Sequence, residues 1–147
     1  MNKALFTSNK QNWETPKELF DKLNNEFNFD LDAASSDKNH KCAHYFTEEQ
    51  NALAQDWSKY KSIFINPPYD SKLQTEFLKK AYETNKTYGT NIVLLIPART
   101  DTVRWHNYIF DKADTLNCLI RINRIWVWPV LHIYNLLIDL CFILYSD

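Results

Sequence analysis

An apolar run joins directly to a stiff polar loop in the segment SIFINPPY, residues 62–69. The run Ser62–Ile65 is short and rich in β-branched and aromatic residues, which predicts a buried strand. The two prolines, Pro67 and Pro68, lack the N–H groups that a central strand needs, so the strand must end at about Asn66. We therefore expect a buried strand with an abrupt, rigid loop at its carboxyl end.

Helical and strand patterns alternate on both sides of this segment. The spacing of apolar residues predicts helices at Pro16–Phe27, Lys72–Thr87 and Thr102–Lys112. An apolar/acidic alternation predicts a strand at Phe29–Asp32, and further strands are predicted at Asn91–Ile96 and Leu116–Ile122. Residues 35–55 are polar and rich in turn residues, with at most a short helix. This alternation predicts an α/β sandwich around a mainly parallel sheet.

Unusual residues stand at the carboxyl ends of the predicted strands. Ligands of open α/β sheets bind beyond these ends. The sequence places Asp32, the loop Asn66–Tyr69 and the loop Pro97–Asp101 there. Their coincidence at one edge of the sheet is the first indication of a functional site.

Composition excludes several classes of protein. The length of 147 residues suggests one domain, and 45% apolar with 24% charged residues is ordinary globular usage. Gly89 is the one glycine of the sequence, which excludes a glycine-rich phosphate loop and a GxGxxG dinucleotide motif. Because the net charge is −1, contact with nucleic acid requires a local basic patch.

The cysteines and histidines indicate neither disulfides nor a metal site. Three cysteines, Cys42, Cys118 and Cys141, leave one thiol unpaired, and the polar start of the chain does not resemble a signal peptide. We therefore expect a reducing cytoplasm. The segment HKCAH, residues 40–44, lacks a second ligand pair at zinc spacing, and we interpret it as a solvated loop without metal.

The loop Asn66–Tyr69 is suited to binding a planar amino group. Its prolines stiffen the backbone, so the side-chain carbonyl of Asn66 and the backbone carbonyl of Pro67 can converge as two acceptors. Tyr69 offers a flat face for a base that has been turned out of its stack. A second interpretation is a Pro-Pro turn that merely ends the strand, with Tyr69 as a packing residue.

Separated motifs resemble one family in colinear order from Phe6 to Leu119. They are Phe6-Thr7-Ser8, Trp13-Glu14-Thr15-Pro16, Phe29-Asp30-Leu31-Asp32-Ala33-Ala34, Lys41-Cys42, Tyr45-Phe46-Thr47, Gln55-Asp56-Trp57, Phe64-Ile65-Asn66-Pro67-Pro68-Tyr69 and Ile96-Pro97-Ala98-Arg99-Thr100-Asp101-Thr102. On these residues the chain resembles the phage-type DNA N6-adenine methyltransferases, the Dam family. The resemblance implies a Rossmann-like methyltransferase fold, S-adenosylmethionine as methyl donor and adenine in DNA as acceptor.

The resemblance also implies roles for particular residues. The catalytic loop would consist of Asn66, Pro67, Pro68 and Tyr69. The cofactor-binding residues would be Trp13, Thr15, Pro16, Asp32, Ala33, Ala34 and Asp56. Three of them also have a structural interpretation: a helix cap for Thr15, a turn for Asp32 and a cap for Asp56.

Double-stranded DNA with a flipped-out adenine is the partner that the resemblance implies, in the cytoplasm of a bacterial or phage-infected cell. We expect no membrane association and no obligate protein partner. Arg99 and Arg104 are candidates for phosphate contact, and the alternative is an Arg–Asp pair that braces a helix start. We assign His106 no catalytic role, because the proton of an amino group can leave after methyl transfer.

The sequence after residue 124 departs from the family pattern. We divide the chain into a methyltransferase domain, residues 1–124, and an atypical apolar tail, residues 125–147. Pro129, His132, Asn135 and Asp139 disfavour a membrane helix in this tail. The codons for Trp126–Pro129, TGG-GTN-TGG-CCN, read GGG-TNT-GGC one base further on, which encodes a Gly-Phe-Gly-like signature that the family would have there.

We therefore favour a frameshift near Arg124–Trp126 over a divergent C-terminus, and the nucleotide sequence of the gene tests this hypothesis. A frameshift would leave the last strands of the sheet missing or replaced, with apolar surface exposed on the tail.

The predicted function is methyl transfer from S-adenosylmethionine to the N6 amino group of adenine in DNA. One alternative is a decayed family member that binds cofactor or DNA without turnover, which the altered tail favours. The other is an amino-methyltransferase that acts on RNA or protein, because the same loop suits any planar amino acceptor.

Overall fold

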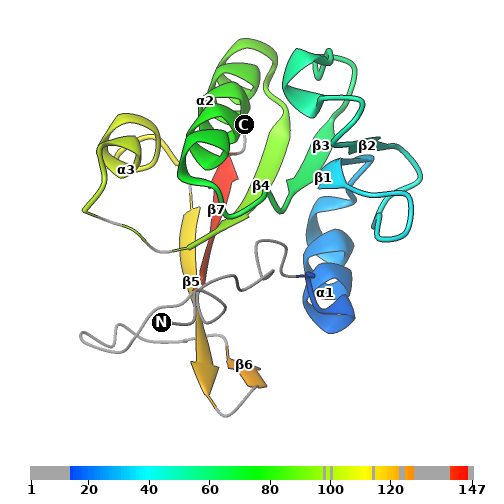
Figure 1. The fold of residues 1–147 in the computed structure, drawn as a ribbon. Helices are drawn as coiled ribbons and strands as arrows, with labels where there is room; N and C mark the ends of the chain where they lie inside the picture. The colour runs from blue at the N-terminus through cyan, green and yellow to red at the C-terminus, as the bar shows by residue number, and fades with distance from the viewer. Residues whose placement is uncertain are drawn as a thin grey trace, which may run out of the picture.

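The structure, a computed structural model, describes residues 14–97, 99, 101–113, 115–122, 125–127 and 140–145. Its helices are α1 (Lys17–Phe27), the short 3-10 helix η2 (Ala52–Ala54), α2 (Ser71–Tyr88) and α3 (Val103–Tyr108). Its strands are β1 (Leu31–Ser35), β2 (Tyr45–Thr47), β3 (Ser62–Ile65), β4 (Asn91–Ile96), β5 (Thr115–Ile122), β6 (Ile125–Val127) and β7 (Leu140–Tyr145). Figure 1 shows the strands as one sheet with helices packed against it.

The seven strands follow the order β2-β1-β3-β4-β7-β5-β6. The first four are parallel to one another, and β7 is antiparallel to both of its neighbours, β4 and β5. Consequently β5 runs in the same direction as β4, and β6 pairs antiparallel to β5 at the far edge. The predicted α/β class, a Rossmann-like sandwich with a mainly parallel sheet, is confirmed.

Two apolar clusters cover the two faces of the sheet. The α1-side cluster joins Leu19, Phe20 and Leu23 of α1 to alternate residues of β3 and β4, with Phe64 and Val93 among them. The α2-side cluster joins residues of α2 and α3 to the intervening strand residues; these include Phe77, Leu78, Trp105, Ile63, Ile65 and Leu94. Because strand side chains alternate between faces, the cluster that contains a strand residue identifies the face it occupies.

Local sequence explains the ends of the two long helices. Asp70 caps α2 by accepting hydrogen bonds from the backbone N–H groups of Lys72 and Leu73 at 3.0 and 2.9 Å. Gly89 ends α2 in the left-handed conformation, with φ of 65°, as C-terminal glycines commonly do. Asn28 ends α1 in the same conformation, with φ of 51°.

Two predicted element boundaries were wrong. We expected the first strand to end at Asp32, but β1 extends to Ser35 because Asp32 and Ser35 pair with Tyr45 and Thr47 of β2. Strand β2 itself lies in the segment that we expected to form turns, since three half-exposed residues give no apolar pattern. The third helix is shorter than expected, because Asp111 lies at positive φ soon after Tyr108.

The apolar tail contributes a central strand. We expected a frameshifted tail to expose apolar surface, yet β7 lies between β4 and β5, and Ile143 and Tyr145 are completely buried. The hydroxyl of Tyr145 donates a hydrogen bond to the backbone carbonyl of Tyr108. Residues 140–145 therefore fill a place in the sheet, while the frameshift and the division at residue 124 stay predictions. No helix within the described ranges is long and apolar enough to cross a membrane.

Candidate functional site

The loop after β3 is held at both ends. Strand β3 ends at Ile65, and α2 begins at Ser71 after its capping residue Asp70. Between them Pro67 is buried, and the ring of Tyr69 is half-buried against the α1-side cluster. Burial raises the pKa of the Tyr69 hydroxyl above its ordinary value. The loop is thus a short rigid bridge at the carboxyl edge of the sheet, as its two prolines predict.

Asn66 contacts the segment that precedes α1. Its side-chain nitrogen Nδ2 donates a hydrogen bond of 3.1 Å to Oγ1 of Thr15. Thr15 is buried, with 6% of its surface exposed, and the next residue, Pro16, is the N-cap of α1. The fold therefore brings the predicted catalytic asparagine together with two predicted cofactor residues from a distant part of the chain.

Asp32 lies on the same face of the sheet as Phe64, because these two residues are paired in β1 and β3. Ala34 packs against the α2-side cluster instead, and the pairing of β1 with β2 is irregular between Asp32 and Ser35. The carboxylate of Asp32 is buried and accepts hydrogen bonds from the backbone N–H groups of Lys41, at 2.9 Å, and Ala34, at 3.4 Å. Asp32 therefore fixes the end of β1 and the loop before β2, and it pairs with Phe64, two residues before Asn66.

The environment of Asp32 predicts a pH dependence of stability. Burial raises its pKa above the ordinary value of 3.8, and the hydrogen bonds from Lys41 and Ala34 offset this only in part. The folded protein thus binds this proton more tightly than the unfolded chain does. The free energy of unfolding, taken relative to Asp32→Asn, should fall as pH rises from about 4 through the raised pKa, and then level off. Denaturant unfolding of the wild type and of Asp32→Asn across this pH range measures the difference in their free energies of unfolding. A difference that rises with pH would contradict the prediction.

Ala33 and Asp56 lie on the same side of the sheet as Ala34. The side chain of Ala33 is completely buried in the α2-side cluster, so only its backbone lies at the edge near Asp32. Asp56 is exposed and accepts a 2.9 Å hydrogen bond from the backbone N–H of Ser58. Hydrogen bonds from the hydroxyl and the backbone N–H of Ser58 lower the pKa of Asp56. The structure does not bring Asp56 together with Asn66 and Thr15.

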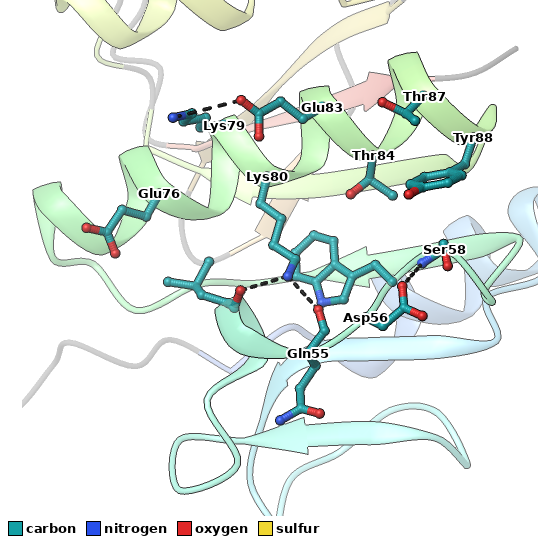
Figure 2. Close-up of a pocket in the computed structure, with 12 residues that line it drawn as sticks. Gln55, Asp56, Ser58, Glu76, Lys79, Lys80, Glu83, Thr84, Thr87 and Tyr88 are labelled. Atoms are coloured by element: carbon teal, nitrogen blue, oxygen red, sulfur yellow. Dashed lines mark hydrogen bonds and ion pairs between the residues drawn. The ribbon is translucent and has the colours of Figure 1, made fainter.

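Asp56 instead lines an open groove of about 580 Å³ between α2 and residues 53–58. Figure 2 shows Lys80 reaching from α2 across this groove. Its ammonium donates to the backbone carbonyls of Leu53, at 2.7 Å, and Gln55, and lies 4.8 Å from the ring centre of Trp57. Lys80 thus braces the chain between β2 and β3 against α2.

The two candidate DNA contacts differ in exposure. Arg99 is exposed. Arg104 is 8% exposed, and its Nη1 donates to the carbonyl and the hydroxyl of Ser71 at 3.1 and 3.3 Å. Burial lowers the pKa of Arg104, with Arg99 as a second cause. Arg104 therefore braces the start of α2 directly behind the loop Asn66–Tyr69, a contact that resembles our structural alternative with a backbone partner in place of an aspartate.

The remaining predictions concern Trp13 and the segment of residues 40–44, and one contact of Asp32 was not predicted. Trp13 lies outside the described residues. The ring of His40 stacks on that of Tyr45 at 4.0 Å between centres, and within the described ranges no three His, Cys, Asp or Glu side chains gather as a metal site requires. Sequence reasoning missed the pairing of Asp32 with the backbone of Lys41, because no motif marks a backbone donor nine residues away.

Comparison with known proteins identifies the family. The sequence model of DNA N-6-adenine-methyltransferase (Dam) matches residues 3–130. The DNA N-6-adenine-methyltransferase of Escherichia phage T1 is 36% identical over 91 residues, which are 61% of this chain and 37% of the phage protein. The putative methyltransferase YfdM of Escherichia coli (strain K12) is 44% identical over 63 residues, which are 39% of this chain and 69% of that protein.

The match thus spans little more than a third of the phage T1 protein. The family match covers most of this chain, including every described residue of the site, and it confirms the resemblance deduced from the separated motifs. The chain belongs to the DNA N-6-adenine-methyltransferase (Dam) family.

Proposed function

We propose that this protein transfers a methyl group from S-adenosylmethionine to the N6 amino group of adenine in double-stranded DNA. The observation that carries the proposal is the position of Asn66. It lies in the loop at the carboxyl end of β3, with its amide bonded to Thr15 at the start of α1. Membership of the Dam family makes an adenine amino group the acceptor that this loop would bind. Such a substrate places the enzyme in the cytoplasm of a bacterial or phage-infected cell.

The loop supplies the groups that an exocyclic amino group needs. Oδ1 of Asn66 and the backbone carbonyl of Pro67 accept its two hydrogens, which directs the nitrogen lone pair toward the methyl donor. A carbonyl oxygen has two lone pairs, so Oδ1 of Asn66 can accept a hydrogen bond from the substrate and a second one at the same time. Tyr69 stacks on the flipped-out base, and Pro68 keeps the loop rigid. The surplus proton leaves the amino group after transfer.

The residues at the carboxyl edge fit S-adenosylmethionine. On the α1 side this edge carries the polar side chains of Thr15 and Asn66, and Asp32 lies on the same face. We assign Pro16 and Asp32 to the cofactor pocket, together with the backbones of Thr15, Ala33 and Ala34; the hydroxyl of Thr15 contacts Asn66 instead. Trp13 and Asp56 remain assigned to it by family resemblance alone. When bound, S-adenosylmethionine supplies a methyl group on a positively charged sulfur.

The proposal is tested by methyl transfer from labelled S-adenosylmethionine to unmethylated double-stranded DNA, followed by digestion to nucleosides. Label in N6-methyl-2′-deoxyadenosine supports the proposed function. Parallel reactions with RNA and with a mixed peptide substrate test the amino-methyltransferase alternative, and preferred labelling of either would overturn the DNA assignment. A folded protein that labels none of the three would favour the decayed family member.

The two arginines are expected to affect DNA binding differently. We propose that exposed Arg99 contacts phosphate, whereas buried Arg104 does not. Arg99→Ala should therefore reduce the slope of log affinity against log salt concentration by about one, and Arg104→Met should leave the slope unchanged. Fluorescence anisotropy with labelled duplex DNA at several salt concentrations measures both slopes. A reduced slope for Arg104→Met alone would reverse the assignment.

A further inference from the structure

The geometry points to Thr15 as a positioning residue that holds the amide of Asn66 for the amino group of the substrate. This inference rests on the proposed function. The resemblance implies that Thr15 contacts the cofactor. The inference made here concerns a different contact of Thr15, the one with the side chain of Asn66. The contact itself is the 3.1 Å hydrogen bond from Nδ2 of Asn66 to Oγ1 of Thr15.

The two ends of an asparagine amide are chemically opposite. Oδ1 accepts hydrogen bonds, whereas Nδ2 carries two hydrogens and only donates. An adenine amino group also donates, so it can bind Asn66 productively only when Oδ1 faces it. In that orientation Nδ2 points elsewhere and needs an acceptor, because a buried donor without a partner is unfavourable. Oγ1 of Thr15 is that acceptor.

A rigid contact between α1 and β3 fixes the distance between the two residues. The rings of Phe20 and Phe64 meet edge to face with 5.2 Å between their centres. Phe64 is two residues before Asn66, and the backbone N–H of Phe20 donates to the carbonyl of Pro16, the residue after Thr15. The packed rings of Phe20 and Phe64 therefore hold the two segments that carry Thr15 and Asn66 next to each other.

The burial of Thr15 makes the loss of its hydroxyl more costly for Asn66. Thr15 is 6% exposed, so water has little access to its hydroxyl, and Asn66 is half-buried. If residue 15 lacked a hydroxyl, Nδ2 would lose this acceptor in the productive orientation, and the amide would turn over or move. The amino group would then face a donor in place of Oδ1. The expected loss therefore falls on turnover rather than on cofactor affinity.

Thr15→Val and Thr15→Ser form the matched pair that tests this role. Valine has nearly the shape of threonine without the hydroxyl, and serine keeps the hydroxyl. We expect Thr15→Val to lower kcat for DNA methylation roughly 10- to 100-fold, with the Kd for S-adenosylmethionine changed less than about twofold. Thr15→Ser should restore kcat to within about threefold of the wild type. Isothermal titration calorimetry gives the Kd, and thermal unfolding shows that each variant is folded.

Three outcomes would overturn the inference. A large rise in the Kd for S-adenosylmethionine with unchanged kcat would make Thr15 a cofactor contact. Equal losses of kcat in both variants would show that the hydroxyl is not the operative group. Lower thermal stability with unchanged kcat per folded molecule would leave Thr15 with a structural role alone.

A spectroscopic measurement separates this inference from the proposed function. The side-chain NH₂ signals of Asn66 can be assigned by NMR through their loss in Asn66→Ala. Hydrogen exchange of these signals should be faster in Thr15→Val than in the wild type and Thr15→Ser, whatever reaction the protein catalyses. Unchanged exchange in Thr15→Val would overturn the contact. Absence of DNA methylation by the wild type would overturn the proposed function instead.

Discussion

Replacement of Asn66 by alanine is expected to lower the rate of DNA methylation about 100- to 1,000-fold. The substitution removes the oxygen that would accept from the adenine amino group, at the carboxyl end of β3 where Pro67 supplies the second acceptor. It leaves the packing of α1 against β3 in place, because Phe20 and Phe64 still meet. The Kd for S-adenosylmethionine should therefore stay within about twofold of the wild type. Single-turnover transfer and calorimetry measure the two quantities.

Asn91→Ala is the matched control for this substitution. Asn91 is also a half-buried asparagine, but it begins β4 at the opposite, amino-terminal edge of the sheet. Its backbone N–H donates to the carbonyl of Lys61, a bond that alanine preserves. We expect its methylation rate to stay within about twofold of the wild type. If Asn66→Ala and Asn91→Ala behaved alike, the loop after β3 would not be the catalytic site.

Replacement of Ile143 by aspartate is expected to abolish cooperative folding. Ile143 is completely buried in β7, where it pairs with Leu94 of the central strand β4. An unpaired carboxylate in such a place costs at least about 4 kcal/mol, a large part of the stability of an ordinary domain. Circular dichroism during urea unfolding should show no folded baseline or a strongly lowered midpoint.

Val103→Asp controls for the introduction of a charge. Val103 is also β-branched and apolar, but it is 73% exposed at the start of α3. Its unfolding midpoint should stay close to that of the wild type, because surface substitutions of this kind change stability little. An Ile143→Asp protein as stable as Val103→Asp would mean that β7 does not occupy the centre of the sheet in solution.

The elements that the sequence predicts well are those with local signals. Helix α2 has an aspartate cap, a terminal glycine and a buried stripe, and it begins and ends within one residue of the prediction. Strand β7 has no such signal. Its described side chains, from Ile143 to Tyr145, are all buried, and a strand covered on both faces is a continuous apolar run without period. Its place in the sheet depends on pairing with distant β4, which local patterns do not encode.

The candidate site could be predicted in part. The chemistry of the Asn66 loop follows from its residue types and from its position after a strand. The face occupied by Ala33 was also accessible, because alternation along a strand places it opposite Asp32. The packing of Ala34 on the same side as Ala33 was not, because β1 is irregular between Asp32 and Ser35. The hydrogen bond between Thr15 and Asn66 could not be predicted from the sequence, since it joins residues 51 positions apart through the packing of α1 on β3.

The position of β7 has a consequence for biosynthesis. Strands β1 to β4 are made early, but β4 gains its second neighbour only when residues 140–145 have left the ribosome. Until then the backbone of Asn91–Ile96 presents an open edge to other nascent chains. Pairings this distant in sequence also slow the closing step of folding. The nascent protein should therefore depend on chaperones until β7 has been made.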